Sequence, residues 1–249
     1  MSSQNILGII PARYASTRFP GKPLADIGGK SMIQRVVEQA KKSQSLQKVV
    51  VATDDQRIVD HVTALGHEVV LTSPSHPTGT DRCKEVVEKI NGSFDYAINI
   101  QGDEPFIHPQ QIDLLAECLD GKTELATLVK KIEDYETLFN PNAVRVLINA
   151  LNEAIYFTRE TLPHVRGREK STWLDYFTYY KHIGIYAYRT DILDKITQLP
   201  QGRLELAESL EQLRWIENGL KIKVNYTEHE TQGIDTPEDL ERAVRLYGL

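Results

Sequence analysis

The chain contains little cysteine, no excess of positive charge and no long apolar run. Its two cysteines, Cys83 and Cys118, are too few for a disulfide framework and lack metal-knuckle spacing, so we expect buried thiols in a reducing compartment. With 29 Lys and Arg against 35 Asp and Glu, the formal net charge is −6, which argues against nucleic-acid binding. No apolar run approaches the roughly 20 residues of a membrane span, and the N-terminus lacks a signal-peptide pattern. We therefore expect a soluble, cytoplasmic protein that does not contact membranes.

The sequence also lacks internal boundaries. No Pro/Gly/Ser-rich linker, low-complexity tract or repeat divides the 249 residues, so we expect one domain spanning residues 1–249. In the first half, short apolar segments alternate with amphipathic helical segments, and this alternation predicts a parallel sheet with strands at residues 6–10, 49–52, 69–71 and 96–100. Ligands of such sheets bind beyond the carboxyl ends of the strands, which is where any site is expected.

Aromatic residues concentrate between residues 130 and 190. This stretch holds seven Tyr, three Phe and Trp173, more than half of the aromatic residues of the chain. Segments 143–148, 154–158 and 183–188 have strand-like patterns, which predict a mixed sheet or a β subdomain. Core packing, a sugar pocket and a subunit interface all remain open interpretations of the cluster.

A loop with three cations follows the first expected strand. Arg13, Arg18 and Lys22 lie among small, Gly and Pro residues whose irregular backbone can direct amides at an anion. At an effective dielectric of about 20, a cation about 4 Å from a phosphate oxygen contributes roughly 4 kcal/mol before desolvation. Three cations suit a triphosphate better than a monoester.

Two familiar phosphate motifs are incomplete or absent. Gly29-Lys30-Ser31 resembles the end of a P-loop, but Leu24 stands where that motif needs its first glycine. Ser31 is better explained as the N-cap of a helix, in a capping box with Gln34. No G-x-G-x-x-G follows any expected strand, so a nicotinamide or flavin site has no support.

Residues 10–24, IPARYASTRFPGKPL, resemble the signature of the 3-deoxy-manno-octulosonate cytidylyltransferases, the CMP-Kdo synthetases. Seven further blocks match in order, at residues 51–54, 78–82, 99–105, 140–144, 182–186, 210–214 and 233–240. The resemblance implies an α/β, Rossmann-like three-layer nucleotidyltransferase fold with a mostly parallel sheet and an aromatic-rich β or mixed insertion. It also implies that residues 1–125 mainly bind CTP and that residues 126–249 mainly bind the sugar acid and form a homodimer contact.

Asp103 and Asp235 are the candidate metal ligands. From the residues alone, Asp103 after Gly102 is a turn aspartate, and Asp235 precedes an ordinary helix start in which Thr236 is the N-cap. Because Thr236 does the capping, Asp235 is left for another task. The resemblance implies that both carboxylates bind Mg²⁺, which prefers one or two carboxylates together with substrate phosphates.

The implied reaction is CMP transfer from CTP to the anomeric 2-hydroxyl of 3-deoxy-D-manno-octulosonate (Kdo), with release of pyrophosphate. Matching positions imply catalytic roles for Arg13, Lys22, Asp103 and Asp235. The nucleotide-binding set implied is Ala12, Arg13, Ser16, Thr17, Arg18, Lys22, Thr78, Gly79, Arg82 and Gln101. The sugar-binding set implied is Gln101, Arg159, His182, Glu211 and Gln212.

Several of these residues also have a purely structural interpretation that involves no substrate. The segment 78–81 reads equally well as a turn followed by a helix cap at Thr80. Glu211 and Gln212 fit the solvated face of a helix that carries Leu210 and Leu213. His76 and His108 are interpreted as bystanders, because a metal can activate the hydroxyl without a histidine base.

Two rival functions differ in acceptor or in class. One is a cytidylyltransferase for 8-amino-Kdo or sialic acid, and the other is a non-catalytic, nucleotide-binding regulatory module. The block at residues 101–105 argues against the sialate enzyme, and intact Arg13, Lys22, Asp103 and Asp235 argue against a regulatory module. The resemblance further implies Mg²⁺ as cofactor, CTP and a 3-deoxy sugar acid as partners, a homodimer, and a product used in lipopolysaccharide synthesis.

Overall fold

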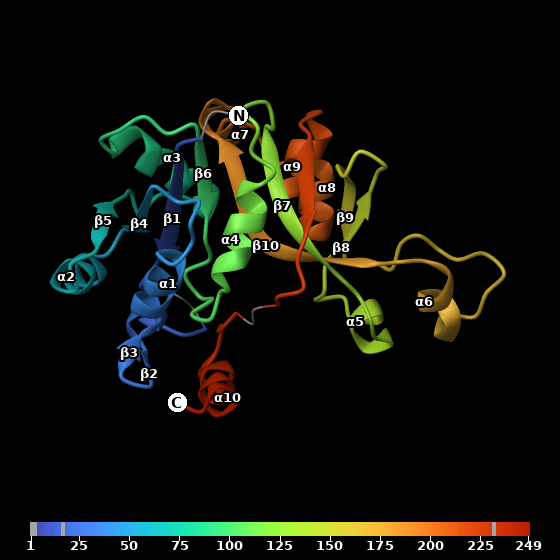
Figure 1. The fold of residues 1–249 in the computed structure, drawn as a ribbon, viewed down its shortest axis with the longest axis horizontal. Coiled ribbons are helices and arrows are strands. Elements are labelled where there is room, and N and C mark those ends of the chain that lie inside the picture. Colours follow the sequence, from blue (N-terminus) through green and yellow to red (C-terminus); the bar gives the residue numbers. More distant parts are fainter. Residues whose placement is uncertain (1–3, 16–17, 231–232) are drawn as a thin grey trace.

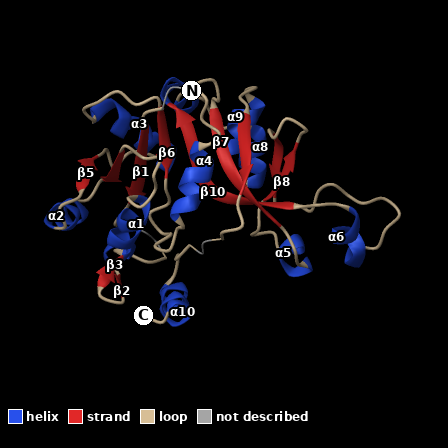
Figure 2. Ribbon diagram, in the orientation of Figure 1, coloured by secondary structure: helices blue, strands red, loops and turns tan. Residues whose placement is uncertain are grey.

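A twisted sheet forms the centre of the molecule. The computed structural model describes residues 4–15, 18–230 and 233–249, and in these residues nine strands form one sheet whose main path has the order β11-β7-β10-β6-β1-β4-β5 (Figures 1 and 2). The strands of this path are β1 (Ile6–Ala12), β4 (Lys48–Thr53), β5 (Glu68–Leu71), β6 (Tyr96–Asn99), β7 (Leu125–Lys131), β10 (Tyr180–Arg189) and β11 (Ile222–Tyr226). Strands β6, β1, β4 and β5 are parallel, as are β7 and β11, whereas β10 runs antiparallel between the two groups.

Strand β1 is apolar on both sides, so helices must pack against both faces of the sheet to bury it. Ile6 and Ile10 enter one core and Leu7 and Ile9 the other, because successive side chains of a strand point to opposite faces. Helices α1 (Met32–Ala40), α2 (Gln56–Ala64) and α4 (Pro109–Ala116) contribute to the first core. The second core receives α3 (Gly79–Lys89), α7 (Thr190–Thr197), α8 (Arg203–Glu208) and α9 (Gln212–Glu217). The result is the predicted three-layer α/β fold with a mostly parallel sheet.

The aromatic-rich stretch divides between the sheet and a projecting segment. Strands β8 (Arg145–Ile148) and β9 (Ala154–Thr158) pair with each other, and β8 also pairs with β10, so the predicted mixed strands are present. A separate small core packs Trp173 and Tyr179 against Ile132 and Leu138. The segment that carries α6 (Trp173–Tyr176) extends away from the sheet, beyond α5 (Tyr135–Phe139) (Figure 1).

The C-terminal helix packs apart from the two main cores. Helix α10 (Pro237–Tyr247) lies with the hairpin of β2 (Asp26–Ile27) and β3 (Lys30–Ser31), where Ile27, Met32, Ile234 and Ala243 form a small cluster (Figure 1). Thr236 is its N-cap in a capping box with Asp239, as the sequence predicts. Asp235 therefore stands immediately before a fixed helix start.

Three local expectations need correction. Strands β7 and β11 were not expected, because their short patterns show no distinctive alternation and their partners are distant in sequence. Helix α3 begins two residues earlier than the cap at Thr80 predicts, with Thr78 as N-cap, because Asp81 completes a capping box with Thr78. Ser31 does cap α1, but the Gln34 side chain donates to Glu38 instead of completing the box.

The two cysteines also differ from each other. Cys83 is buried on α3, and burial raises the pKa of its thiol well above the usual range. Cys118 is only partly buried and follows the end of α4 rather than lying on it, and burial raises the pKa of its thiol to about 11. Neither thiol is activated as a nucleophile. No helix in the described residues is both long and apolar enough to cross a membrane.

Candidate functional site

A crevice opens where β1 and β6 end, at the edge of the sheet predicted for ligand binding. Its cavity has a volume of about 310 Å³. Most of the predicted phosphate and metal residues line it together; the lining set is Pro11, Ala12, Arg13, Ala15, Arg18, Lys22, Pro23, Gly79, Arg82, Gln101, Gly102, Asp103 and Asp235. Ser16 and Thr17, predicted for the same loop, lie outside the described residues.

Gly102 explains how Asp103 reaches this crevice. A Cβ atom at Gly102 would lie 2.4 Å from the carbonyl oxygen of Pro11, closer than any side chain tolerates. Only glycine lets the loop after β6 pass so near the end of β1. The same loop is tied to β10 by Gln101, whose Nε2 donates to the carbonyl of Gly184 at 2.7 Å.

Lys22 joins the two candidate metal ligands. Its Nζ donates to Asp103 Oδ2 at 2.8 Å and to Asp235 Oδ1 at 3.0 Å, although these residues are far apart in the chain. Burial disfavours the charged form of Lys22, but the two carboxylates outweigh it and raise the pKa of the ammonium. Arg18 adds an ion pair with Asp235 Oδ2 at 3.1 Å. Two anions and two cations thus converge on one point.

The donor set of this point fits Mg²⁺. The carboxylates of Asp103 and Asp235 offer hard oxygen atoms, and their side chains remain 31% and 42% exposed. Across the described part of the chain, no group of three or more His, Cys, Asp or Glu could enclose a metal ion. Two carboxylates beside a phosphate cradle match a cation that takes its other ligands from water and substrate phosphates.

The described part of the phosphate loop is held by an aromatic ring. The Tyr14 ring lies under the Arg57 guanidinium, 3.3 Å from its centre, and Arg57 also pairs with Asp55 at 2.6 Å. The Tyr14 carbonyl accepts from the amide of Gly21, whose positive φ of 73° suits glycine. Arg13 donates to the carbonyl of His76. Arg57 was assigned no role from the sequence, and nothing in the local pattern distinguishes it from a surface cation.

The turn at Thr78 and Gly79, predicted to bind the nucleotide, borders the crevice at the start of α3. Gly79 lines the cavity, and a Cβ atom there would meet Asn99 and Pro11 only at ordinary contact distances of 3.5 and 3.6 Å. Arg82 is fully buried, and its Nη2 donates to Asp54 Oδ2 at 2.8 Å. The Arg82 guanidinium therefore already has a carboxylate partner, and its predicted nucleotide role remains a prediction.

The residues predicted to bind the sugar are half-buried or buried rather than fully solvated. Burial lowers the pKa of His182 to about 3, and its Nε2 lies 3.0 Å from Thr127 Oγ1. Burial also raises the pKa of Glu211, against the effect of Thr80, whose Oγ1 donates to Glu211 Oε2 at 3.0 Å. Gln212 is buried as well. The solvated-face interpretation is therefore wrong, because Gln212 at the start of α9 is buried and Glu211, the N-cap residue of α9, is half-buried and bonded to Thr80 of α3.

Two buried polar atoms near these residues lack partners. Asn99 Oδ1 and Tyr186 Oη have no hydrogen bond within the described residues, although both atoms are buried. Asn99 Nδ2 lies 3.4 Å from Tyr188 Oη, so its amide is directed into the same polar cluster. Both residues belong to blocks of the family signature, but their residue types alone gave no reason to assign them a role.

Arg159 lies away from the crevice. It lines a separate cavity of about 560 Å³ with Arg145 and Trp173. Its Nε donates to the carbonyl of Glu208 at 2.8 Å, and its Nη1 donates to the carbonyl of Pro141 at 3.2 Å. The predicted contact between Arg159 and a sugar carboxylate remains a prediction that this arrangement does not bring into the crevice.

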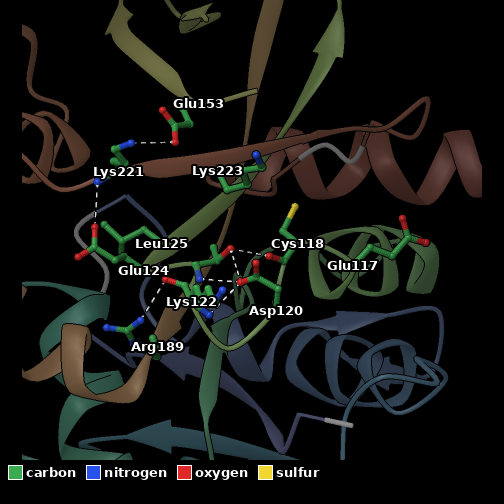
Figure 3. A pocket seen from close by; sticks show the side chains of 11 residues that line it. Glu117, Cys118, Asp120, Lys122, Glu124, Leu125, Glu153, Arg189, Lys221 and Lys223 are labelled. Atoms are coloured by element: carbon green, nitrogen blue, oxygen red, sulfur yellow. Dashed lines mark hydrogen bonds and ion pairs between the residues drawn. The ribbon is translucent and has the colours of Figure 1, made fainter. Parts of the chain in front are cut away.

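A larger cavity at the opposite end of the sheet has different chemistry. Its volume is about 520 Å³, and it lies where β7 and β11 begin and β10 ends (Figure 3). Its charges are mostly paired within the protein: Lys221 contacts Glu153 at 3.3 Å, and Asp120 accepts from the amides of the turn at Lys122 and Thr123. The smaller crevice, with its convergent cations and carboxylates, is the better candidate site.

Comparisons with known proteins agree with this geometry. The cytidylyltransferase family model matches residues 7–222. The 3-deoxy-manno-octulosonate cytidylyltransferase of Parabacteroides distasonis is 60% identical over 243 residues, which cover 96% of each chain. The enzyme of the same name from Cytophaga hutchinsonii is 59% identical over 242 residues, which cover 97% of each chain.

Comparison with solved structures also identifies a cytidylyltransferase fold. A CMP:2-keto-3-deoxy-manno-octonic acid synthetase in complex with CTP superposes with a TM-score of 0.91 at 40% identity, covering 98% of both chains. A 4-diphosphocytidyl-2C-methyl-D-erythritol synthase from Anaerococcus prevotii shares the fold alone, with a TM-score of 0.64 at 14% identity. The chain belongs to the 3-deoxy-manno-octulosonate cytidylyltransferase family of nucleotidyltransferase enzymes.

Proposed function

We propose that the crevice transfers CMP from CTP to the anomeric 2-hydroxyl of Kdo and releases pyrophosphate. The observation that carries this proposal is the convergence of Asp103 and Asp235 on Lys22 beside the phosphate loop, with each carboxylate within hydrogen-bond distance of the Lys22 ammonium. Family membership supports the choice of both substrates, since the relatives carry the octulosonate name and the solved neighbour holds CTP. These relatives do not favour 8-amino-Kdo, sialic acid or a non-catalytic module.

The phosphate loop supplies the positive charge that a triphosphate needs. Arg13, Arg18 and Lys22 line one cavity, and a cation about 4 Å from a phosphate contributes roughly 4 kcal/mol at an effective dielectric of about 20. Because Lys22 stays charged, it is able to follow negative charge that develops on the phosphates during transfer. The same residues favour the departure of pyrophosphate.

Asp103 and Asp235 are proposed to hold Mg²⁺, which when bound lowers the pKa of the sugar hydroxyl and neutralises phosphate charge. Lys22 keeps these two like-charged groups together in the ligand-free protein. Phosphate oxygens give the Lys22 ammonium an alternative acceptor once the carboxylates are occupied. In this proposal, Mg²⁺ would replace the Lys22 ammonium as the partner of the Asp103 and Asp235 carboxylates.

The acceptor is proposed to contact the buried polar side of the crevice. Gln101 stands at the boundary between the phosphate loop and β10. His182, Glu211 and Gln212 supply donors and acceptors that suit sugar hydroxyls, and Tyr186 Oη offers a buried hydroxyl without a partner in the described residues. In this division, residues 1–125 mainly bind CTP and residues 126–249 mainly bind the sugar acid.

The wider setting is also part of the proposal. The product would serve lipopolysaccharide synthesis in the cytoplasm, and the protein would be a homodimer. Exposed apolar side chains in the projecting segment, Leu162, Tyr176 and Phe177, support a subunit contact there (Figure 1). Light scattering of the purified protein is expected to give twice the chain mass of 28.3 kDa; a monomer at assay concentration would contradict the dimer.

Pyrophosphate release tests the function. Purified protein is incubated with CTP, Mg²⁺ and either Kdo, 8-amino-Kdo or N-acetylneuraminate, with EDTA as the metal control. We expect release with Kdo and Mg²⁺, and none with EDTA or with N-acetylneuraminate. Binding of CTP without turnover of any acceptor would contradict the proposal and favour a nucleotide-binding module.

A further inference from the structure

The loop that carries Asp103 contacts the C-terminal segment of the chain both before and after Asp235. At Asp103 itself, the backbone carbonyl accepts from the amide of Ile234 at 2.9 Å. Beyond it, the Phe106 and Tyr247 rings stack with centroids 3.7 Å apart and planes 12° apart. The His108 and His229 rings stack in the same way, 3.7 Å and 8° apart. Three contacts thus connect two segments that are distant in sequence.

The two stacks add to the other contacts that place Asp235, which are its ion pairs with Lys22 and Arg18 and the packing of Ile234. After β11 the chain leaves the sheet, and α10 packs in a small cluster with Ile27 and Met32 rather than in either main core (Figure 1). Further hydrogen bonds hold the His229 end: Gln111 donates to the His229 carbonyl at 3.3 Å, and Gln110 Oε1 lies 2.8 Å from the His229 ring. The stacks therefore brace the segment before and after Asp235.

We propose that the Phe106–Tyr247 and His108–His229 stacks, here called the aromatic clasp, are positioning contacts that set the spacing of the Asp103 and Asp235 carboxylates for a divalent cation. The proposal rests on the proposed function, in which these carboxylates hold Mg²⁺. Two carboxylates repel each other, so a site with the spacing already fixed binds a cation without first having to bring them together. The clasp residues touch neither substrate nor metal.

Variants of Tyr247 test the first stack. Tyr247 is 46% exposed, so Tyr247→Ala is expected to leave the two main cores intact. Loss of an aromatic pair should weaken Mn²⁺ binding, measured by calorimetry with CTP present and no acceptor, by roughly 2- to 12-fold. Tyr247→Phe keeps the ring and should bind as wild type does. Leu246→Ala is the matched control, because Leu246 lies on the same helix and is 69% exposed.

Variants of His229 test the second stack independently. His229→Ala should weaken Mn²⁺ binding over the same range, whereas His229→Phe retains a stacking ring and should restore most of the affinity. In steady state, both alanine variants should raise the Mg²⁺ concentration for half-maximal rate and keep kcat at saturating metal. If both bound Mn²⁺ like wild type while remaining folded by circular dichroism, the clasp would be wrong.

Asp235→Asn separates failure of the clasp from failure of the metal assignment. If Asp235→Asn weakens Mn²⁺ binding and the two alanine variants do not, only the clasp fails. If wild type and Asp235→Asn bind Mn²⁺ equally, the metal assignment in the proposed function fails, and the clasp with it.

Discussion

The two sides of the crevice hold their polar groups in opposite ways. On the phosphate side, Lys22, Asp103 and Asp235 are charged, partly exposed and paired with one another. On the proposed acceptor side, His182 and Glu211 are half-buried, and loss of water shifts the pKa of each in the direction that favours its neutral form. We propose that the first side acts through charge on anions and a metal, and that the second discriminates among acceptors through hydrogen bonds.

Removing a carboxylate from the charged side should have the largest effect. Asp103→Asn and Asp235→Asn each preserve size but withdraw a metal ligand, so we expect kcat to fall by roughly 100- to 1000-fold with the fold intact. Initial rates at saturating Mg²⁺ and a thermal melt of each variant check this. Near-normal rates for either variant would remove that residue from the metal site.

Arg159→Ala tests how far the acceptor side extends. If Arg159 binds the sugar carboxylate, its loss should raise KM for the sugar acid by roughly 10- to 100-fold and leave KM for CTP nearly unchanged. The structure shows Arg159 bonded to the carbonyls of Glu208 and Pro141, away from the crevice cavity. Equal changes in both KM values, with a lower melting temperature, would make Arg159 a structural residue.

Tyr186→Phe should separate binding from stability on the acceptor side. Tyr186 Oη is buried without a partner in the described structure, so deleting it should leave the melting temperature unchanged or slightly higher. A sugar hydroxyl that pairs with it would lose one hydrogen bond, which raises KM for the sugar acid by roughly 2- to 12-fold. Tyr96→Phe is the matched control, since Tyr96 Oη donates to the Thr123 carbonyl far from the crevice. An unchanged KM in Tyr186→Phe would remove Tyr186 from the acceptor site.

The smallest expected effect concerns His182 and pH. Burial lowers the pKa of His182 to about 3, below the ordinary value of about 6.5 for an unfolded chain. Its contribution to the free energy of unfolding is therefore complete above about pH 6.5 and declines as the pH falls toward 3. Urea unfolding at about pH 5 and about pH 7.5 should show a smaller loss for His182→Gln than for wild type. An equal loss in both proteins would show that His182 is not held neutral by burial.

Local sequence logic predicted the charged side better than the buried side. The helix-start pattern left Asp235 without a capping task, and the structure confirms that Thr236 and Asp239 form the capping box while Asp235 pairs with Lys22. The glycine before Asp103 was not singled out from the sequence, because the close approach that requires it is to Pro11, which is distant in the chain. Charge, turns and caps act over a few residues, so the sequence shows them directly.

The residues on the proposed acceptor side are placed by contacts between segments that are distant in sequence, and no local pattern predicts such contacts. Glu211 looked like a solvated helix residue, yet α9 packs it against Thr80, which the sequence analysis assigned to a cap. Tyr186 and Asn99 become candidates only because their unpaired atoms are buried together with this cluster. Strand β7, which supplies Thr127 beneath His182, was itself missed. Tertiary packing decides which polar residues lose water, so their roles followed from family resemblance alone.

The most direct test of the account is the position of the metal. Crystals grown with CTP and Mn²⁺ give an anomalous difference map that locates the metal without assumptions about activity. We expect a peak bonded to both Asp103 and Asp235, with Lys22 moved to a phosphate oxygen. A peak on the β- and γ-phosphates alone, with Lys22 still bonded to both carboxylates, would contradict it.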